Sequence, residues 1–307
     1  PWVWLNAGAV SISLVMVVGL LLLIAVRGLS HFWPADLMAV SYTEPGKKAI
    51  TLVGEKVDSE EVTAQQLGRV VVELPAGQAS AERILLKVGN RDYFGLDFTW
   101  INQPWMGEVT YPEKLLSIER REWGHFYGYL TSVKQQGEVV VEGDDVFAVL
   151  QLRLERSNKL VDEIKALEKG EIGKINAGLE ELRLERRKLE LREVPEASIQ
   201  YAELTETEKQ LDIAYKNLQK TLGDLYTALN RDQMMVMMSD GREVEIPLAK
   251  VVQAHQPNAM SLTEKTGTYF HEIWKFVSGD PREANTEGGV FPAIFGTVMM
   301  VMIMAVL

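Results

Sequence analysis

The sequence predicts a membrane protein with α-helical spans and one large α+β loop, in which a β-rich platform carries an antiparallel coiled-coil hairpin. The first observation is segregated charge: residues 1–26 and 288–307 contain no Asp, Glu, Lys or Arg, so the whole net charge of −11 lies between Arg27 and Glu287. The second is a change of hydrophobic period within the loop, from strand-like alternation to heptads.

Residues 1–31 are predicted to form the first transmembrane helix. The run Ala7–Val26 is twenty residues long, and Ser11 and Ser13 are its only polar interruptions. At about 1.5 Å per residue, a helix of this length covers the roughly 30 Å hydrocarbon core of a bilayer. A secretory signal would have a shorter apolar region followed by a small-residue cleavage site, so a span is the favoured interpretation.

Residues 288–307 are predicted to be the start of a second, truncated transmembrane helix. They read GGVFPAIFGTVMMVMIMAVL, an apolar run that continues to the last residue without a polar flank. The chain is therefore expected to be a fragment, cut in or just after the second span. Pro292 is compatible with a helix that begins near Phe291, because a proline in the first turn removes no helical hydrogen bond.

Residues 35–142 are predicted to be the β-rich part of the loop. Short apolar or alternating runs are separated by glycine and charge, which is typical of strands joined by turns. The runs are AITLVGEKV, GRVVVELP, ERILLKVGN, YFGLDFTWI and GEVVVEGDD.

Residues 145–231 are predicted to form the coiled-coil helical hairpin. A break is expected at 193–198, where Pro195 disfavours a helical conformation in the residue before it. Gly170 and Gly173 are expected to weaken the first helix. Spacings of three, four and seven define the apolar seam, which consists of Ile172, Ile175, Leu179, Leu182, Leu189, Leu204, Leu211, Ala214, Leu218, Leu225 and Leu229.

Residues 232–287 are predicted to form a β-hairpin and a return segment to the membrane. Asp240-Gly241 between two apolar runs is a hairpin signal. The preceding cluster of Met234, Met235, Met237 and Met238 contains soft ligands for a metal such as copper. A buried strand explains the same residues more simply, since they would alternate between its faces.

Several classes of function find no support in these residues. The chain has no cysteine, and its four histidines show no HExxH or i, i+4 spacing. The string around Gly170 and Gly173 has the wrong spacing for a phosphate-binding loop. Acidic pairs such as Asp144-Asp145 and Glu180-Glu181 are expected to be solvated surface. An acidic chain without a basic patch argues against nucleic acid, and we expect neither an enzyme nor a bound cofactor or metal.

The segment from Thr286 carries a resemblance to a known family. TEGGVFPAIFGT, followed by an aliphatic span, resembles the segment that opens the membrane core of phosphate ABC transporter permeases. More narrowly, a first span, a large insertion and a Gly-Gly…Pro…Gly-Thr segment are similar to the PstA type in its long proteobacterial form. The positions that carry this motif are Gly288, Gly289, Pro292, Gly296 and Thr297, where small residues permit close helix packing.

The resemblance implies a multi-pass protein of the bacterial inner membrane whose large loop faces the periplasm. It implies a permease subunit of an ATP-driven phosphate importer, in contact with membrane lipid. Its partners would be a second permease subunit, a pair of ATPase subunits that hydrolyse ATP, and a periplasmic phosphate-binding protein. The phosphate-contacting residues of the family would lie downstream of the present sequence.

The loop itself is expected to dock a partner protein. It carries the whole net charge of −11, and such a surface repels phosphate rather than attracting it. A two-span envelope scaffold or adaptor and a transmembrane sensor with a coiled-coil extracytoplasmic domain remain as alternatives. Self-association of the hairpin also stays open, since coiled-coil seams can pair with one another.

Overall fold

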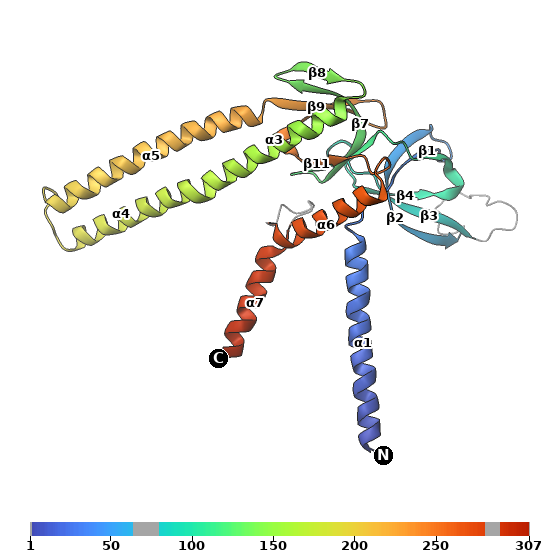
Figure 1. Ribbon diagram of the computed structural model, residues 1–307, viewed down its shortest axis with the longest axis horizontal. Helices are drawn as coiled ribbons and strands as arrows, with labels where there is room; N and C mark the ends of the chain where they lie inside the picture. The colour runs from blue at the N-terminus through green and yellow to red at the C-terminus, as the bar shows by residue number, and fades with distance from the viewer. Residues whose placement is uncertain (1, 64–79, 280–288, 307) are drawn as a thin grey trace. The chain divides into compact units, whose positions relative to one another are not determined.

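The computed structural model describes residues 2–63, 80–279 and 289–306. Two β-sheets combine with long helices (Figure 1), which confirms the predicted α+β character of the loop. Contacts along the chain divide it into two units. Residues 1–129 and 254–307 form the first unit, and residues 130–253 form the second.

The first unit holds the two apolar helices and most of the strands. Its elements are α1 (Trp2–Ser30), β1 (Leu37–Tyr42), β2 (Ile50–Thr63), β3 (Ser80–Lys87), α2 (Arg91–Phe94), β4 (Phe98–Asn102), η1 (Gln103–Trp105), β5 (Met106–Thr110), β6 (Leu115–Arg120), α6 (Leu262–Ser278) and α7 (Phe291–Val306).

The second unit holds the helical hairpin and the methionine-rich strand. Its elements are β8 (Glu138–Glu142), α3 (Val146–Ala166), η2 (Leu167–Ile172), α4 (Gly173–Leu191), α5 (Ile199–Leu229), β9 (Asp232–Met237), β10 (Glu243–Pro247) and η3 (Leu248–Lys250). The unit boundaries fall within β7 (His125–Gln135) and β11 (Val251–His255).

The first sheet has the strand order β4-β3-β2-β1-β5, and neighbouring strands are antiparallel. Strand β1 is buried on both faces because successive side chains point to opposite sides of a strand. Met38 and Val40 belong to one apolar cluster, while Leu37 and Ala39 belong to another on the opposite face. The second sheet has the order β10-β9-β7-β6-β11, with β8 paired to β7.

Most of the strand-like runs form strands, with one correction. The start of YFGLDFTWI forms the short helix α2 rather than a strand. Asn90 and Gly95 flank this turn in left-handed conformations, with φ of 53° and 77°, and such conformations begin and end a turn rather than continue a strand. The run GRVVVELP lies outside the described residues.

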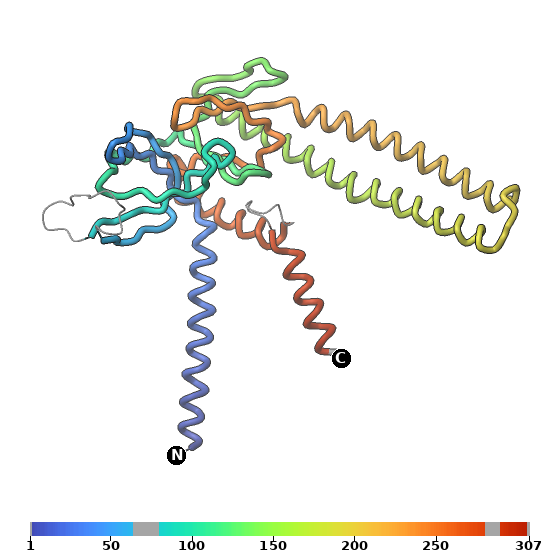
Figure 2. The backbone as a smooth tube through the Cα atoms, turned by 180° about the vertical axis from the view of Figure 1, so that it is seen from behind, coloured from blue at the N-terminus to red at the C-terminus, as the bar shows by residue number. Residues whose placement is uncertain are grey.

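The predicted helical hairpin is present, and we call α3, η2, α4 and α5 together the arm. The two helical segments run side by side in opposite directions (Figure 2). The first segment ends at Leu191 and the second begins at Ile199, where Ser198 caps the helix by accepting a hydrogen bond from the Tyr201 amide. The predicted seam is confirmed, because every seam side chain is buried or half-buried.

The expected weak point in the first helix is also visible. Residues Leu167–Ile172 form a π-helix, which contains Gly170 and is followed by Gly173. A π-turn adds one residue to a helical turn and is marginal energetically, and glycine lacks the side chain that would favour regular α-helix.

Three of the four clustered methionines lie in strand β9, as predicted, and Met238 directly follows it. Met234 and Met238 are fully buried, whereas Met237 is 37% exposed, so the side chains alternate between the two faces of the strand. Strand β9 pairs antiparallel with β10, and Gly241 takes the positive φ of 84° that the intervening turn requires.

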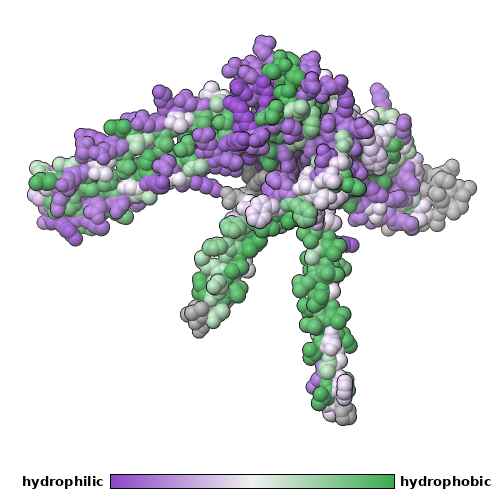
Figure 3. All heavy atoms as spheres, in the orientation of Figure 1, coloured by the Kyte–Doolittle hydropathy of each residue, from purple (hydrophilic) through white to green (hydrophobic). Residues whose placement is uncertain are grey.

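Among the described helices, α1 alone is long and apolar enough to cross a membrane. Helix α7 begins at Phe291, with Pro292 in its first turn as predicted, but its apolar stretch Phe291–Ala305 is shorter. Most of the surface of both helices is hydrophobic (Figure 3).

Candidate functional site

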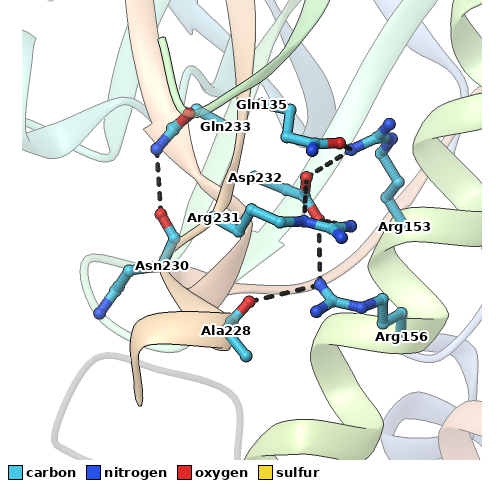
Figure 4. A network of polar contacts seen from close by, with 8 residues as sticks. All are labelled: Gln135, Arg153, Arg156, Ala228, Asn230, Arg231, Asp232 and Gln233. Carbon is cyan, nitrogen blue, oxygen red and sulfur yellow. Dashed lines mark hydrogen bonds and ion pairs between the residues drawn. The ribbon is translucent and has the colours of Figure 1, made fainter. Parts of the chain in front are cut away.

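A buried carboxylate holds the base of the arm, where α3 and the end of α5 meet the start of β9. We call this region the root. Asp232 is 1% exposed and lies at the start of β9, directly after α5 (Figure 4). Three arginines surround it. Arg153 forms an ion pair with its Oδ1, Arg156 donates to Oδ2 at 3.2 Å, and Arg231 donates to the same oxygen at 2.8 Å.

These contacts join the two helical segments of the arm. Arg153 and Arg156 come from α3, whereas Asp232 follows α5. Arg156 also donates to the Ala228 carbonyl at 3.3 Å, which fills an acceptor at the end of α5. A buried carboxylate is costly unless charged donors surround it, so this network fixes how the arm leaves the sheet.

Apolar packing extends the root along the arm. Val161, Ile164, Leu222 and Leu229 form one buried cluster between α3 and α5. The Asn158 side-chain amide donates to the Val252 carbonyl at 2.8 Å, which ties α3 to β11 within the second unit. The root therefore combines a hydrophobic core with satisfied polar groups.

The tip of the arm, residues 189–201, carries exposed apolar side chains. Leu191 and Ile199 are 72% and 77% exposed on either side of the connecting loop. A shallow hollow beside them is lined by Arg186, Glu190, Glu196, Tyr201, Thr205 and Lys209.

An ion pair joins the two helices near the tip. Arg186 on α4 donates to Glu208 on α5 at 2.8 Å. The combination of exposed apolar side chains with a rim of mixed charge is typical of a surface that binds another protein.

A second polar cluster lies in the first unit. Lys275 on α6 donates to Glu119 on β6 at 2.6 Å and to Glu272 at 3.2 Å. Glu119 is 2% exposed. Nearby, Lys87 Nζ and His125 Nδ1 are 3.1 Å apart, which requires a neutral imidazole that accepts the hydrogen bond.

Two of the four histidines, His125 and His255, lie near this cluster, although they are far apart in the sequence. Burial, with the nearby Lys87 as a second cause, lowers the pKa of His125 to about 3. Burial also lowers the pKa of His255. Both are packing residues held neutral at physiological pH. Within residues 2–63, 80–279 and 289–306, no group of three or more His, Asp or Glu side chains is placed to hold a metal ion.

The structure gives a packing reason for only some of the predicted motif positions. Gly288 lies outside the described residues. A Cβ added at Gly289 would lie 2.0 Å from the Gly279 carbonyl oxygen, so this position needs glycine where the chain passes the end of α6. Gly296 faces open space, and Thr297 donates to the Ala293 carbonyl of its own helix at 2.7 Å. Neither residue contacts another described segment through these groups.

The acidic pairs Asp144-Asp145 and Glu180-Glu181 are exposed, as expected. Sequence reasoning missed both polar clusters. Asp232 and Arg153 are 79 residues apart, and Lys275 and Glu119 are 156 apart. One signal was available for Asp232: a charged residue begins a strand that is otherwise apolar, next to Arg231.

Comparisons with protein-family models, with curated proteins and with solved structures give no match.

Proposed function

We propose that this chain belongs to the permease subunit of an ATP-driven phosphate importer and that its α+β region is a periplasmic docking domain. The observation that carries the proposal is the order along the chain. The apolar helix α1 is followed by the charged α+β region and then by the apolar helix α7, which opens with Pro292. This order supports the resemblance of residues 286–297 to phosphate permeases.

The proposal places the protein in the bacterial inner membrane as a multi-pass subunit. Helix α1 is a span, and α7 begins a second one. The partners are membrane lipid, a second permease subunit, ATPase subunits and a phosphate-binding protein. ATP hydrolysis takes place on the ATPase subunits, and this chain has a transport role and not an enzymatic one.

Docking by the arm is the contribution of the α+β region. A net charge of −11 disfavours attraction of free phosphate. The exposed Leu191 and Ile199 at the tip offer apolar surface to a partner, and the root network around Asp232 holds the arm in one orientation. The arm thus presents a preorganised surface, which lowers the entropic cost of binding.

Affinity purification of the complete gene product from its native membranes tests both parts. We expect the wild-type protein to retain the second permease subunit, the ATPase subunits and the phosphate-binding protein. The double variant Leu191→Glu/Ile199→Glu is expected to lose the periplasmic partner and to keep the others. Leu152→Glu is the matched control, because Leu152 is 70% exposed but lies near the root.

The outcomes separate the two claims. Retention of every partner by the double variant would remove the docking role and leave the importer assignment. Purification without any importer subunit would remove the assignment itself. An envelope adaptor is the second candidate, favoured by the finding that one described helix is long enough to span a membrane. An adaptor would co-purify with envelope proteins other than importer subunits.

A further inference from the structure

Helix α6 packs one face against the residues that directly follow α1. The Tyr269 ring lies 5.8 Å from the Trp33 ring, and the Phe276 ring lies 5.1 Å from the Phe32 ring. Because α1 ends at Ser30, these contacts place α6 beside the end of the apolar helix.

Ion pairs attach α6 to the rest of the first unit at two further points. Lys265 pairs with Asp36, and Lys275 pairs with the buried Glu119 at 2.6 Å. The two lysines are ten residues apart, so α6 is attached to the first unit near both of its ends and its rotation about its own axis is set.

The opposite face is open; its large side chains are apolar, and the exposed Thr263 and Thr266 lie among them. Leu262, Phe270, Trp274 and Val277 are 76%, 64%, 69% and 43% exposed. At about 100° per residue, these four side chains fall within a sector of roughly 120° on the helix. Beyond that sector, His271 and Ser278 are exposed and polar, and Phe276 is 37% exposed where it packs beside Phe32.

Contacts also join the end of α6 to the residues that precede the second apolar helix. The Val290 amide donates to the Phe276 carbonyl at 2.9 Å, and Gly289 passes against Gly279. Both apolar helices therefore approach α6, α1 through the residues that follow it and α7 through the residues that precede it.

We propose that α6 is an interfacial helix whose Leu262, Phe270, Trp274 and Val277 side chains insert into the headgroup region of the bilayer. An amphipathic helix with aromatic and aliphatic residues on one face lies in the plane of the interface, and tryptophan is favoured at that depth. The inference rests on the membrane anchorage by α1 in the proposed function. It gives α6 the task of fixing the height of the α+β region above the membrane.

Spin labelling tests this inference: residues 1–307 contain no cysteine, and any cysteine elsewhere in the complete protein is first replaced by serine. The variants Phe270→Cys and His271→Cys place nitroxides on neighbouring positions about 100° apart on the helix. The complete protein is reconstituted into phosphatidylcholine vesicles, and collision with oxygen and with a water-soluble nickel chelate is measured. Oxygen concentrates in the bilayer, whereas the chelate stays in water.

We expect a several-fold higher ratio of oxygen to chelate accessibility at residue 270 than at residue 271. Val277→Cys repeats the test on the apolar face. Leu21→Cys, in the middle of α1, reports on anchorage independently. A lipid-like ratio at 21 with water-like ratios at 270 and 277 would overturn the inference and leave the anchorage standing. Low accessibility to both reagents at 270 would also overturn it, because a protein would then cover this face. A water-like ratio at 21 would overturn the anchorage itself.

Discussion

At the scale of single residues, buried charges decide where the elements meet. Asp232 is surrounded by three arginines, and Arg120 donates bidentate hydrogen bonds of 2.7 and 2.9 Å to Asp92. Planar guanidinium groups match a carboxylate in this geometry. Removing one partner from such a buried pair costs more than the pair contributes, since the remaining charge loses its compensation.

Asp232→Asn is expected to lower the free energy of unfolding by about 3–5 kcal/mol, because three guanidinium groups would lose the charge that they share. Chemical denaturation followed by circular dichroism in detergent measures the change. Asp240→Asn is the control: Asp240 pairs with Arg242 at 2.7 Å, but the arginine side chain is 56% exposed. A surface pair contributes about 1 kcal/mol or less. Equal effects of the two substitutions would contradict the assigned role of Asp232.

His125 makes the stability of the protein depend on pH. Its pKa falls to about 3 in the folded chain, against an ordinary value of 6.5. Between these values the unfolded state binds a proton that the folded state does not bind, so stability falls as the pH drops below 6.5. His255, whose pKa is also lowered, acts in the same direction.

We expect a loss of about 1.4 kcal/mol per pH unit below pH 6.5 from His125 alone. Denaturation at pH 7 and pH 5 measures it. His125→Gln should show a shallower dependence than the wild type. The groups that surround His125 include Lys87, Glu119, His255 and Lys275. A wild-type protein equally stable at both pH values would refute the neutral burial of His125.

At the scale of elements, the arm was largely predictable and the sheets were not. Heptad spacing identifies a helix face without knowledge of its neighbours, and Pro195 with Ser198 marks the connecting loop. Pairing in the first sheet places β5 next to β1, although the sequence shows no feature that would select this neighbour. Strand order depends on contacts distant in sequence, and period-two alternation specifies only which face is buried.

Gly170 lies in the π-helical turn of the arm and has open space where a Cβ would be. Gly170→Ala is therefore expected to raise the stability of the arm by up to about 1 kcal/mol, mainly by restricting the unfolded chain. Thermal unfolding followed at 222 nm measures the gain.

Gly178→Ala serves as the comparison. Its added Cβ would lie 3.2 Å from Leu211 Cδ1 on the facing helix, so a smaller gain or a loss is expected. Destabilisation by Gly170→Ala would show that the π-helical turn is needed for the arm to form.

At the scale of the whole molecule, the candidate site was predicted in outline and not in detail. The sequence indicated a projecting hairpin between apolar ends, and the hairpin is present. The root network and the Glu119–Lys275 contact could not be derived, because they join residues that only the folded chain brings together. The glycines of the motif, in contrast, were identified from the sequence alone. A side chain at Gly289 would clash with a neighbouring backbone, whereas Gly296 faces open space.

Phosphate uptake tests the central claim most directly. Cells that lack the complete gene are compared with the same cells that carry the gene on a plasmid, and uptake of radiolabelled phosphate is measured at low external phosphate. We expect uptake to be lost on deletion and restored by the wild-type gene, with partial restoration by Leu191→Glu/Ile199→Glu and full restoration by Leu152→Glu. Unchanged uptake in the deleted cells would contradict the assignment to a phosphate importer.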